Sequence, residues 1–175
     1  MLTFLANLLD WSSDNDMQLN TSKTKEMILG PLAQSHIPSL TISSGAIERV
    51  TSFKLLGLYI DSSLSWSTHV ENITKKATID YIFLNSSSEL ECEKHLLHFY
   101  TTVIRPILEY CAPVWHYVLT RTQAQQLKAI QKRAIHVILN LSRGMSYSSM
   151  LFAMDLESLT DRRENLSRNF FLDIV

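Results

Sequence analysis

The sequence is poor in cysteine and glycine, and it has neither a long apolar run nor an excess of one charge sign. Two cysteines among 175 residues exclude a disulfide-stabilised scaffold and suit a reducing compartment, so we expect an intracellular protein, cytoplasmic or nuclear. The longest apolar runs are too short to cross a bilayer, which predicts no membrane partner. A formal net charge of -1, taken over the whole chain, gives no reason to expect nucleic-acid binding.

Common catalytic motifs are missing as well. The four glycines form no G-x-G-x-x-G or G-x-x-x-x-G-K motif, so nothing supports binding of a dinucleotide or of a P-loop nucleotide. No G-x-S-x-G elbow is present, and no histidine begins an H-x-D triplet. A series of Cys92, His95, Cys111 and His116 superficially follows zinc spacing, but its positions fall on expected helices and apolar stretches. We therefore predict no metal site and no cofactor in this chain.

Short β elements are expected in the first third of the chain, after an amphipathic helix that starts near residue 2 and ends before the polar residues 12–16. Apolar runs bounded by turn formers predict strands at residues 27–29, 40–43 and 53–61. Within the last of these, Gly57 indicates a bulge or a close approach of the backbone.

From about residue 64 the apolar residues recur at helical spacing. Capping boxes are expected at Thr68 with Glu71 and at Thr120 with Gln123, and Pro106 should end or kink the helix that contains it. Further helices are predicted at residues 150–154 and 159–174. The fold class is therefore α+β: a small β-containing piece, residues 1–62, precedes a mainly α-helical module, residues 63–175.

Charge becomes informative when it is counted by region. Residues 94–144 hold seven basic residues and one acid, Glu109, so this stretch has an excess of six positive charges. The basic residues are Lys94, Arg105, Arg121, Lys128, Lys132, Arg133 and Arg143. Lys128, Lys132 and His136 are spaced four apart and share one side of a helix, where they form either a solvated surface or a stripe that contacts phosphates.

Five ordered strings resemble the reverse transcriptases of non-LTR retrotransposons, the LINE-type elements. They are residues 17–26 (MQLNTSKTKE), 52–61 (SFKLLGLYID), 99–115 (FYTTVIRPILEY and APVW), 131–134 (QKRA) and 162–165 (RREN). The match covers nearly the whole chain. It implies that residues 1–62 are a palm remnant and that residues 63–175 correspond to the helical thumb and the connection beyond it.

The resemblance also implies roles for individual residues. Lys23 matches the lysine that the family is proposed to use as a general acid, and Lys54 and Gly57 lie in the string that resembles the primer-grip hairpin. The parent enzymes are RNA-directed DNA polymerases that use magnesium held by paired aspartates, and this chain has no F/Y-x-D-D motif. We therefore expect no polymerase activity from this chain alone.

The preferred reading is a catalytically incomplete, reverse-transcriptase-derived fragment that binds duplex or RNA–DNA hybrid nucleic acid weakly and without sequence preference. The contacts are expected at Lys54, Gly57, Lys128, Lys132, Arg133 and Arg143. The early region also resembles the AlkB homologue eight N-terminal domain, which implies RNA modification by a methyltransferase or an iron- and 2-oxoglutarate-dependent oxygenase. An interaction module without a nucleic-acid role is the third reading. Without the rest of a palm, exposed apolar surface predicts self-association.

Overall fold

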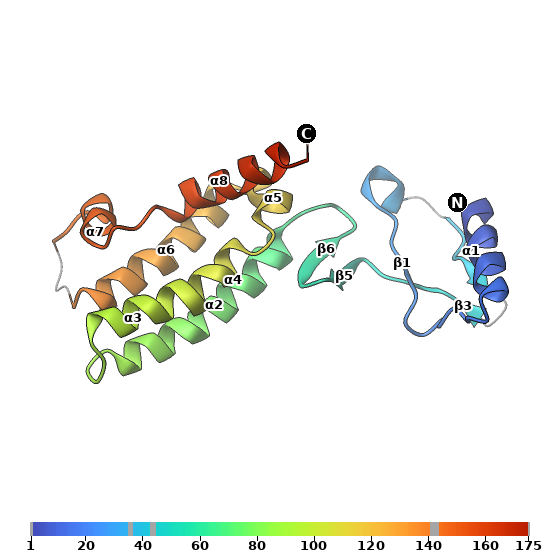
Figure 1. Cartoon of the computed structure of the whole chain (residues 1–175). Helices are drawn as coiled ribbons and strands as arrows, with labels where there is room; N and C mark the ends of the chain where they lie inside the picture. The colour runs from blue at the N-terminus through green and yellow to red at the C-terminus, as the bar shows by residue number, and fades with distance from the viewer. Residues whose placement is uncertain (1, 35–36, 43–44, 141–143, 175) are drawn as a thin grey trace. The chain divides into compact units, whose positions relative to one another are not determined.

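The computed structural model describes residues 2–34, 37–42, 45–140 and 144–174. The chain divides into two compact units, Met1–Ser65 and Trp66–Val175, which are described separately below. The first contains one α-helix and three small two-stranded sheets, and the second is built from helices (Figure 1). The α+β class expected from the sequence is confirmed, with its helical residues concentrated in the second unit.

The first unit begins with helix α1, Leu2–Asp14, as the spacing of its leucines predicts. Its strands are very short, and each pairs with only one other strand. They are β1 Lys25–Glu26, β2 Thr41–Ile42, β3 Gly45–Ala46, β4 Glu48–Arg49, β5 Ser52–Leu55 and β6 Leu58–Asp61. Strands β1 and β4 are parallel, whereas β2–β3 and β5–β6 are antiparallel, and a 3-10 turn at Gly30–Gln34 completes the unit.

A partly buried ion pair between Arg49 and Glu26 joins the parallel strands. The Arg49 guanidinium contacts the Glu26 carboxylate at 3.0 Å and donates hydrogen bonds to the carbonyl oxygens of Ile37 at 2.6 Å and Pro38 at 2.9 Å. One side chain thus joins strand β4, strand β1 and the loop at residues 37–38. The strand expected at residues 27–29 is wrong: pairing occurs two residues earlier, where this clamp fixes the backbone.

The strand expected at residues 53–61 is instead a hairpin with its turn at Leu56 and Gly57. Both turn residues have positive φ, 48° and 90°, which is the pattern of a tight turn whose twist matches that of the flanking strands. Of the two alternatives expected at Gly57, the bulge is therefore wrong, and a close approach of the backbone to a ligand stays a prediction. Strand β2 coincides with the expected strand over Thr41–Ile42, and residue 43 lies outside the described residues.

The second unit contains five α-helices of seven residues or more within its described part. They are α2 Ser67–Ser87, α3 Glu93–Phe99, α6 Arg121–Ile138, α7 Tyr147–Ala153 and α8 Leu159–Leu172. Helix α3 continues through a π-helical turn, η2 Tyr100–Ile104, into the short helix α4 Arg105–Glu109. Two short pieces, α5 Ala112–Trp115 and η3 His116–Val118, follow it. Helix α2 packs on α6 and α4, and α8 lies against α5, α6 and α4 (Figure 1).

The change from α-helix to π-helix before α4 has a local cause. Pro106 has no N–H to donate one turn back, and the preceding turn widens into a π-helix instead of ending the helix. Cys111 then adopts a left-handed conformation, φ 51°, which separates α4 from α5. The helix runs through Pro106 to Glu109, so the expectation that proline ends it there is wrong, and the irregularity at this point is the π-helical turn.

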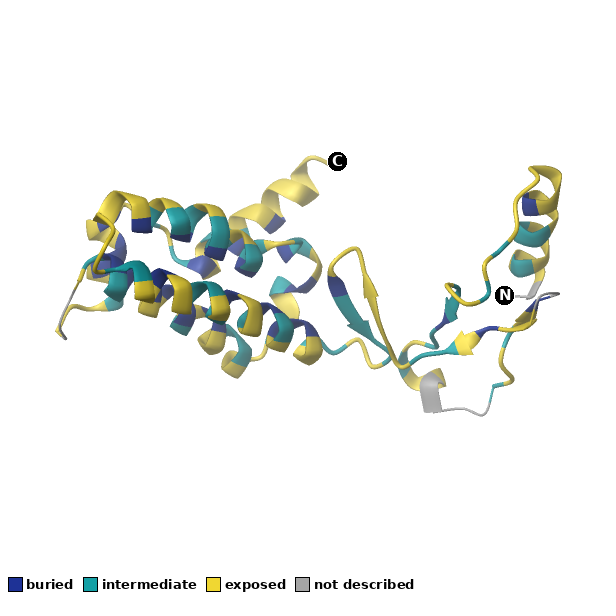
Figure 2. Ribbon diagram, turned by 90° about the horizontal axis from the view of Figure 1, so that it is seen from below, coloured by how far each residue is buried: buried dark blue, intermediate teal, exposed yellow. Residues whose placement is uncertain are grey.

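The core of the second unit consists of the inward sides of these helices (Figure 2). Its fully buried side chains include Tyr100, Leu108, Trp115, Leu127 and Met150. The capping box at Thr120 and Gln123 is confirmed, with hydrogen bonds in both directions. That at Thr68 is wrong, because α2 starts at Ser67 and has no side-chain cap. No helix in the described part of the chain is both long and apolar enough to cross a membrane.

Candidate nucleic-acid interface

Helix α6 has the highest net positive charge of the described elements of the second unit. Its 18 residues include Arg121, Lys128, Lys132 and Arg133 and no aspartate or glutamate. All four basic side chains are exposed, whereas Leu127, Ile130, Ala134, Ile135 and Ile138 are buried against the neighbouring helices. The apolar side of α6 therefore fixes the helix, and its outer side carries an uncompensated charge.

The ammonium group of Lys128 lies over an aromatic ring. Its Nζ lies 4.5 Å from the centroid of the Tyr147 ring, which α7 supplies. Tyr147 in turn donates a hydrogen bond from its hydroxyl to Gln131 Oε1, so the ring has a fixed orientation beneath the lysine. Burial raises the pKa of Tyr147 to about 12, and the ring remains neutral at physiological pH. A cation over an aromatic face gains on the order of 1 kcal/mol while keeping N–H donors for an anion.

Lys132 and Arg133 have no such restraint. Both side chains are exposed, and neither forms an ion pair with a described residue. Lys132 is one turn from Lys128 on the same side of α6, whereas Arg133 is rotated away from this row. His136, the third member of the predicted row, is half-buried. Arg143, another predicted contact, lies outside the described residues.

Two other charged residues of the predicted region, Arg105 and Glu109, lie away from the outer side of α6 on helix α4. Arg105 is half-buried at the start of α4. Glu109, the one acid of the region, does not face α6 charges but binds Arg162 of α8 through two hydrogen bonds of 2.5 and 3.1 Å. This bond raises the pKa of Arg162 and joins α4 to α8. The positive excess on α6 is therefore not cancelled by the Glu109 carboxylate.

The predicted contacts of the first unit lie in a turn, on strand β5 and at the β5–β6 hairpin turn. Lys23 is exposed, and its backbone N–H donates to Asn20 Oδ1 at 3.1 Å. Lys54 lies on β5 opposite Tyr59 of β6, with its Nζ 5.2 Å from the tyrosine ring centroid. Gly57 is exposed at the hairpin turn, with a φ of 90°. Both units thus have exposed basic residues. Lys23, Lys54 and Gly57 belong to the first unit, whereas α6 belongs to the second.

Chemistry beyond charge is sparse in these units. Among the described residues, no three histidine, cysteine, aspartate or glutamate side chains come together in a way that could hold a metal ion. Cys92 is exposed at the start of α3, and Cys111 is partly buried, so the zinc-like series is dispersed over separate elements.

Comparisons with protein-family models, curated proteins and solved structures gave no match to this chain. The resemblance to reverse transcriptases remains a prediction from the sequence.

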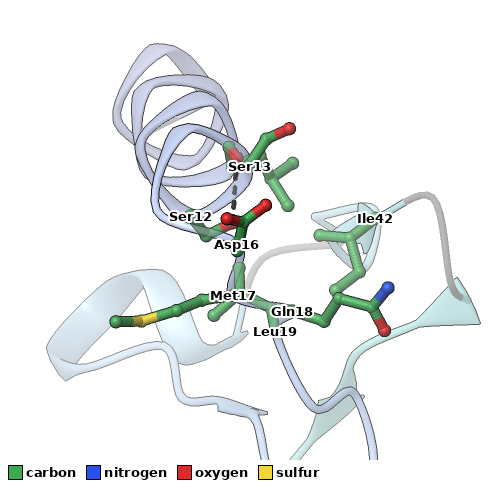
Figure 3. Close-up of a pocket in the computed structure, with 8 residues that line it drawn as sticks. Ser12, Ser13, Asp16, Met17, Gln18, Leu19 and Ile42 are labelled. Atoms are coloured by element: carbon green, nitrogen blue, oxygen red, sulfur yellow. Dashed lines mark hydrogen bonds between the residues drawn. The ribbon is translucent and has the colours of Figure 1, made fainter.

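A pocket in the first unit has a volume of about 540 Å³. It lies between α1 and the segment that follows it, with Ile42 on the opposite wall (Figure 3). Asp16 is its one ionisable side chain, and Ser12 Oγ is occupied by a hydrogen bond to the Leu9 carbonyl at 2.8 Å. The pocket offers no pair of groups for nucleophilic or acid–base chemistry.

Sequence reasoning missed two residues that organise the α6 surface. Gln131 is fully buried and joins α6 to Tyr147 and to the start of α8, and Tyr147 positions Lys128. A signal for Gln131 exists in the sequence: a polar residue lies four positions after Leu127 and three before Ala134, on the apolar side of the helix. No sequence signal places Tyr147 beneath Lys128, because the contact depends on how α7 packs.

Proposed function

We propose that this chain is a reverse-transcriptase-derived segment that binds duplex or RNA–DNA hybrid nucleic acid without polymerising it. The observation that supports the proposal best is the outer side of α6, with four exposed basic residues and no acid. The order of the five family-like strings is an independent argument for the same ligand class. A reducing compartment, cytoplasm or nucleus, follows from this ligand and from the two unpaired cysteines.

The geometry of α6 suits contact with a phosphate backbone. Lys128 and Lys132 are four residues apart, which corresponds to about 6 Å along the helix axis. Two ammonium groups at this spacing reach neighbouring phosphates of one strand. Since these contacts read charge and not base edges, binding should be weak, indifferent to sequence and strongly dependent on salt.

Lys54 and Gly57 are proposed as a second contact, at the hairpin turn of the first unit. A glycine backbone at an exposed turn allows close approach of a strand end, and the lysine supplies a positive charge beside it. Lys23 is the weakest of the predicted residues, because a general acid needs metal-bound pyrophosphate to act upon. We therefore assign Lys23 at most an electrostatic contribution.

A titration of fluorescently labelled duplex by polarisation at 50 and 200 mM salt tests the proposal. The perturbing variant is Lys132→Ala with Arg133→Ala, because these side chains have no contact that supports the fold. Losing two phosphate contacts should reduce the slope of log K against log salt by about 1.8. At 0.15 M salt, this corresponds to roughly fivefold per contact and about thirtyfold for the pair.

The matched control is Lys75→Ala with Lys76→Ala, an adjacent exposed basic pair on α2. We expect this control to weaken binding by less than about threefold, since only long-range attraction is lost. Equal effects of the two pairs would contradict a defined α6 interface. Absence of binding at 50 mM salt would overturn the function and leave the interaction module as the better reading.

Self-association through the first unit is a separate proposal. Large apolar side chains are exposed there, including Phe4, Trp11, Leu32 and Leu56, the last with 82% of its surface accessible. Exposed apolar clusters of this kind favour association. Sedimentation velocity between about 1 and 100 μM should show a rising mean mass. A concentration-independent monomer would contradict the proposal.

A further inference from the structure

The side chain of Trp115 is surrounded by groups that carry or can acquire positive charge. The indole is fully buried in α5, with the His69 ring of α2 at 5.5 Å between centroids and the Arg163 guanidinium of α8 at 5.6 Å from its ring. His69 also meets Trp66 edge-on at 5.8 Å. Three elements thus converge on one aromatic side chain.

Arg163 is an unusual residue for such a place. Only 1% of its surface is exposed, and no carboxylate of the described residues forms an ion pair with it. Its Nε donates to His116 Nδ1 at 3.5 Å, and its buried Nη1 has no hydrogen-bond partner. Its neighbour Arg162 takes both oxygens of Glu109. Burial lowers the pKa of Arg163, as expected when a cation is removed from water without a direct counter-ion.

The bond from Arg163 sets the protonation of His116. A donor on Nε requires a lone pair on His116 Nδ1, so this imidazole must be neutral with its proton on Nε2. Protonation at Nδ1 removes the acceptor and places a second cation against the first. Burial, followed by the charge of Arg163, lowers the pKa of His116, and burial lowers that of His69.

The other charged groups around the cluster do not supply an alternative acceptor. On α8, Glu164 favours the protonated form of His116 but is bound by Arg168 at 2.5 Å. On α4, Glu109 is bound by Arg162, and no charged group contributes to the shift of His69. Tyr117 faces His116 with its ring, 4.9 Å between centroids.

We propose that His69, His116 and Arg163 around Trp115 form a proton-sensitive latch, which holds α8 against α5 at neutral pH and releases it in mild acid. The sign follows from linkage. A histidine whose pKa is lowered in the folded state binds its proton more readily when released, so stability is complete above pH 6.5 and falls as the pH falls below it. The release concerns α8 first, because α8 carries the buried arginine. This inference is independent of nucleic-acid binding.

Hydrogen exchange of the full chain, followed by mass spectrometry at pH 7.5 and 5.5 and corrected for intrinsic rates, tests the latch. Peptides of residues 159–172 should lose protection at pH 5.5, by up to about tenfold for each histidine, because this pH is one unit below the pKa of a free histidine. Peptides of α6 should lose clearly less protection at pH 5.5 than peptides of α8. Equal loss in α6 and α8 would overturn the latch in favour of general acid destabilisation.

Two variants keep the test sharp. His69→Phe with His116→Asn removes both titrating groups but keeps an aromatic ring and an acceptor for Arg163, and its α8 protection should not change between the two pH values. His98→Asn, on an exposed histidine of α3, is the matched control and should behave like the unmodified chain. If the double variant does not fold, Arg163→Met serves instead, since removing the cation should reduce the pH effect. An unchanged pH effect in either variant would refute the proposal.

Discussion

Replacing Gln131 with leucine tests whether one buried amide holds three helices together. The side chain is fully buried in α6, and it makes three hydrogen bonds to other elements. Its Oε1 accepts from the Tyr147 hydroxyl and from the Leu159 backbone N–H at 3.0 Å, and its Nε2 donates to the Glu157 carbonyl at 3.1 Å. Leucine has a similar volume, so the substitution removes these bonds with little change in packing.

The expected cost can be worked out from the groups left behind. The Leu159 N–H is buried, and an unsatisfied buried donor costs about 1–3 kcal/mol. Tyr147 is half-buried, so water replaces only part of the hydrogen bond that it donates to Gln131, at a cost on the order of 1 kcal/mol, whereas the Glu157 carbonyl lies on an exposed residue and is rehydrated. The sum is about 2–4 kcal/mol. For a helical unit of this size we expect a fall in Tm on the order of 10 °C.

Urea denaturation followed by circular dichroism at 222 nm measures this loss, because the signal comes mainly from the helical unit. The matched control is Gln125→Leu, the same change at an exposed position of α6, which should alter stability by less than about 0.5 kcal/mol. A loss below about 1 kcal/mol for Gln131→Leu, or one equal to the control, would refute the role given to this amide.

Three further changes test other parts of the fold. Arg49→Leu leaves the Glu26 carboxylate buried and unpaired, so the first unit should lose about 3 kcal/mol or more and become protease-sensitive in residues 1–65 while residues 66–175 stay protected. Gly57→Val forces a branched residue to positive φ and should cost about 1–3 kcal/mol, visible as faster hydrogen exchange in residues 52–61. Leu127→Ala opens a cavity at a fully buried position and should lower the free energy of unfolding by about 2–5 kcal/mol in urea titrations.

Local chemistry made several helices predictable. The start of α6 follows from Thr120 and Gln123, whose side chains satisfy each other's backbone N–H groups without help from the rest of the fold. The start of α8 follows in the same way from Ser158, whose hydroxyl accepts from the Asp161 N–H at 3.2 Å. The residues that decide these boundaries are three positions apart, so a linear sequence displays them.

Contacts between distant residues were not predictable. Strand β1 exists because Lys25–Glu26 pairs with Glu48–Arg49. Its sequence, two charged residues, has no strand propensity, and the apolar residues 27–29 that follow form no strand. The basic stripe was visible in the sequence, since charge and helical period suffice to find it. The Arg163 cluster was not, because burial of that arginine depends on Trp115, 48 positions earlier in the chain.

The inner side of helix α6 supports the fold, and its outer side carries the proposed binding residues. Gln131 and the apolar residues face inward and bind α7 and α8, while Lys132 and Arg133 face outward and support no contact of the fold. Lys128 is the link between the two sides, because Tyr147 positions it and is itself oriented by Gln131. Substitutions at Lys132 or Arg133 should therefore change binding and leave stability intact, whereas loss of the Gln131 amide should weaken both, since it also releases the ring beneath Lys128.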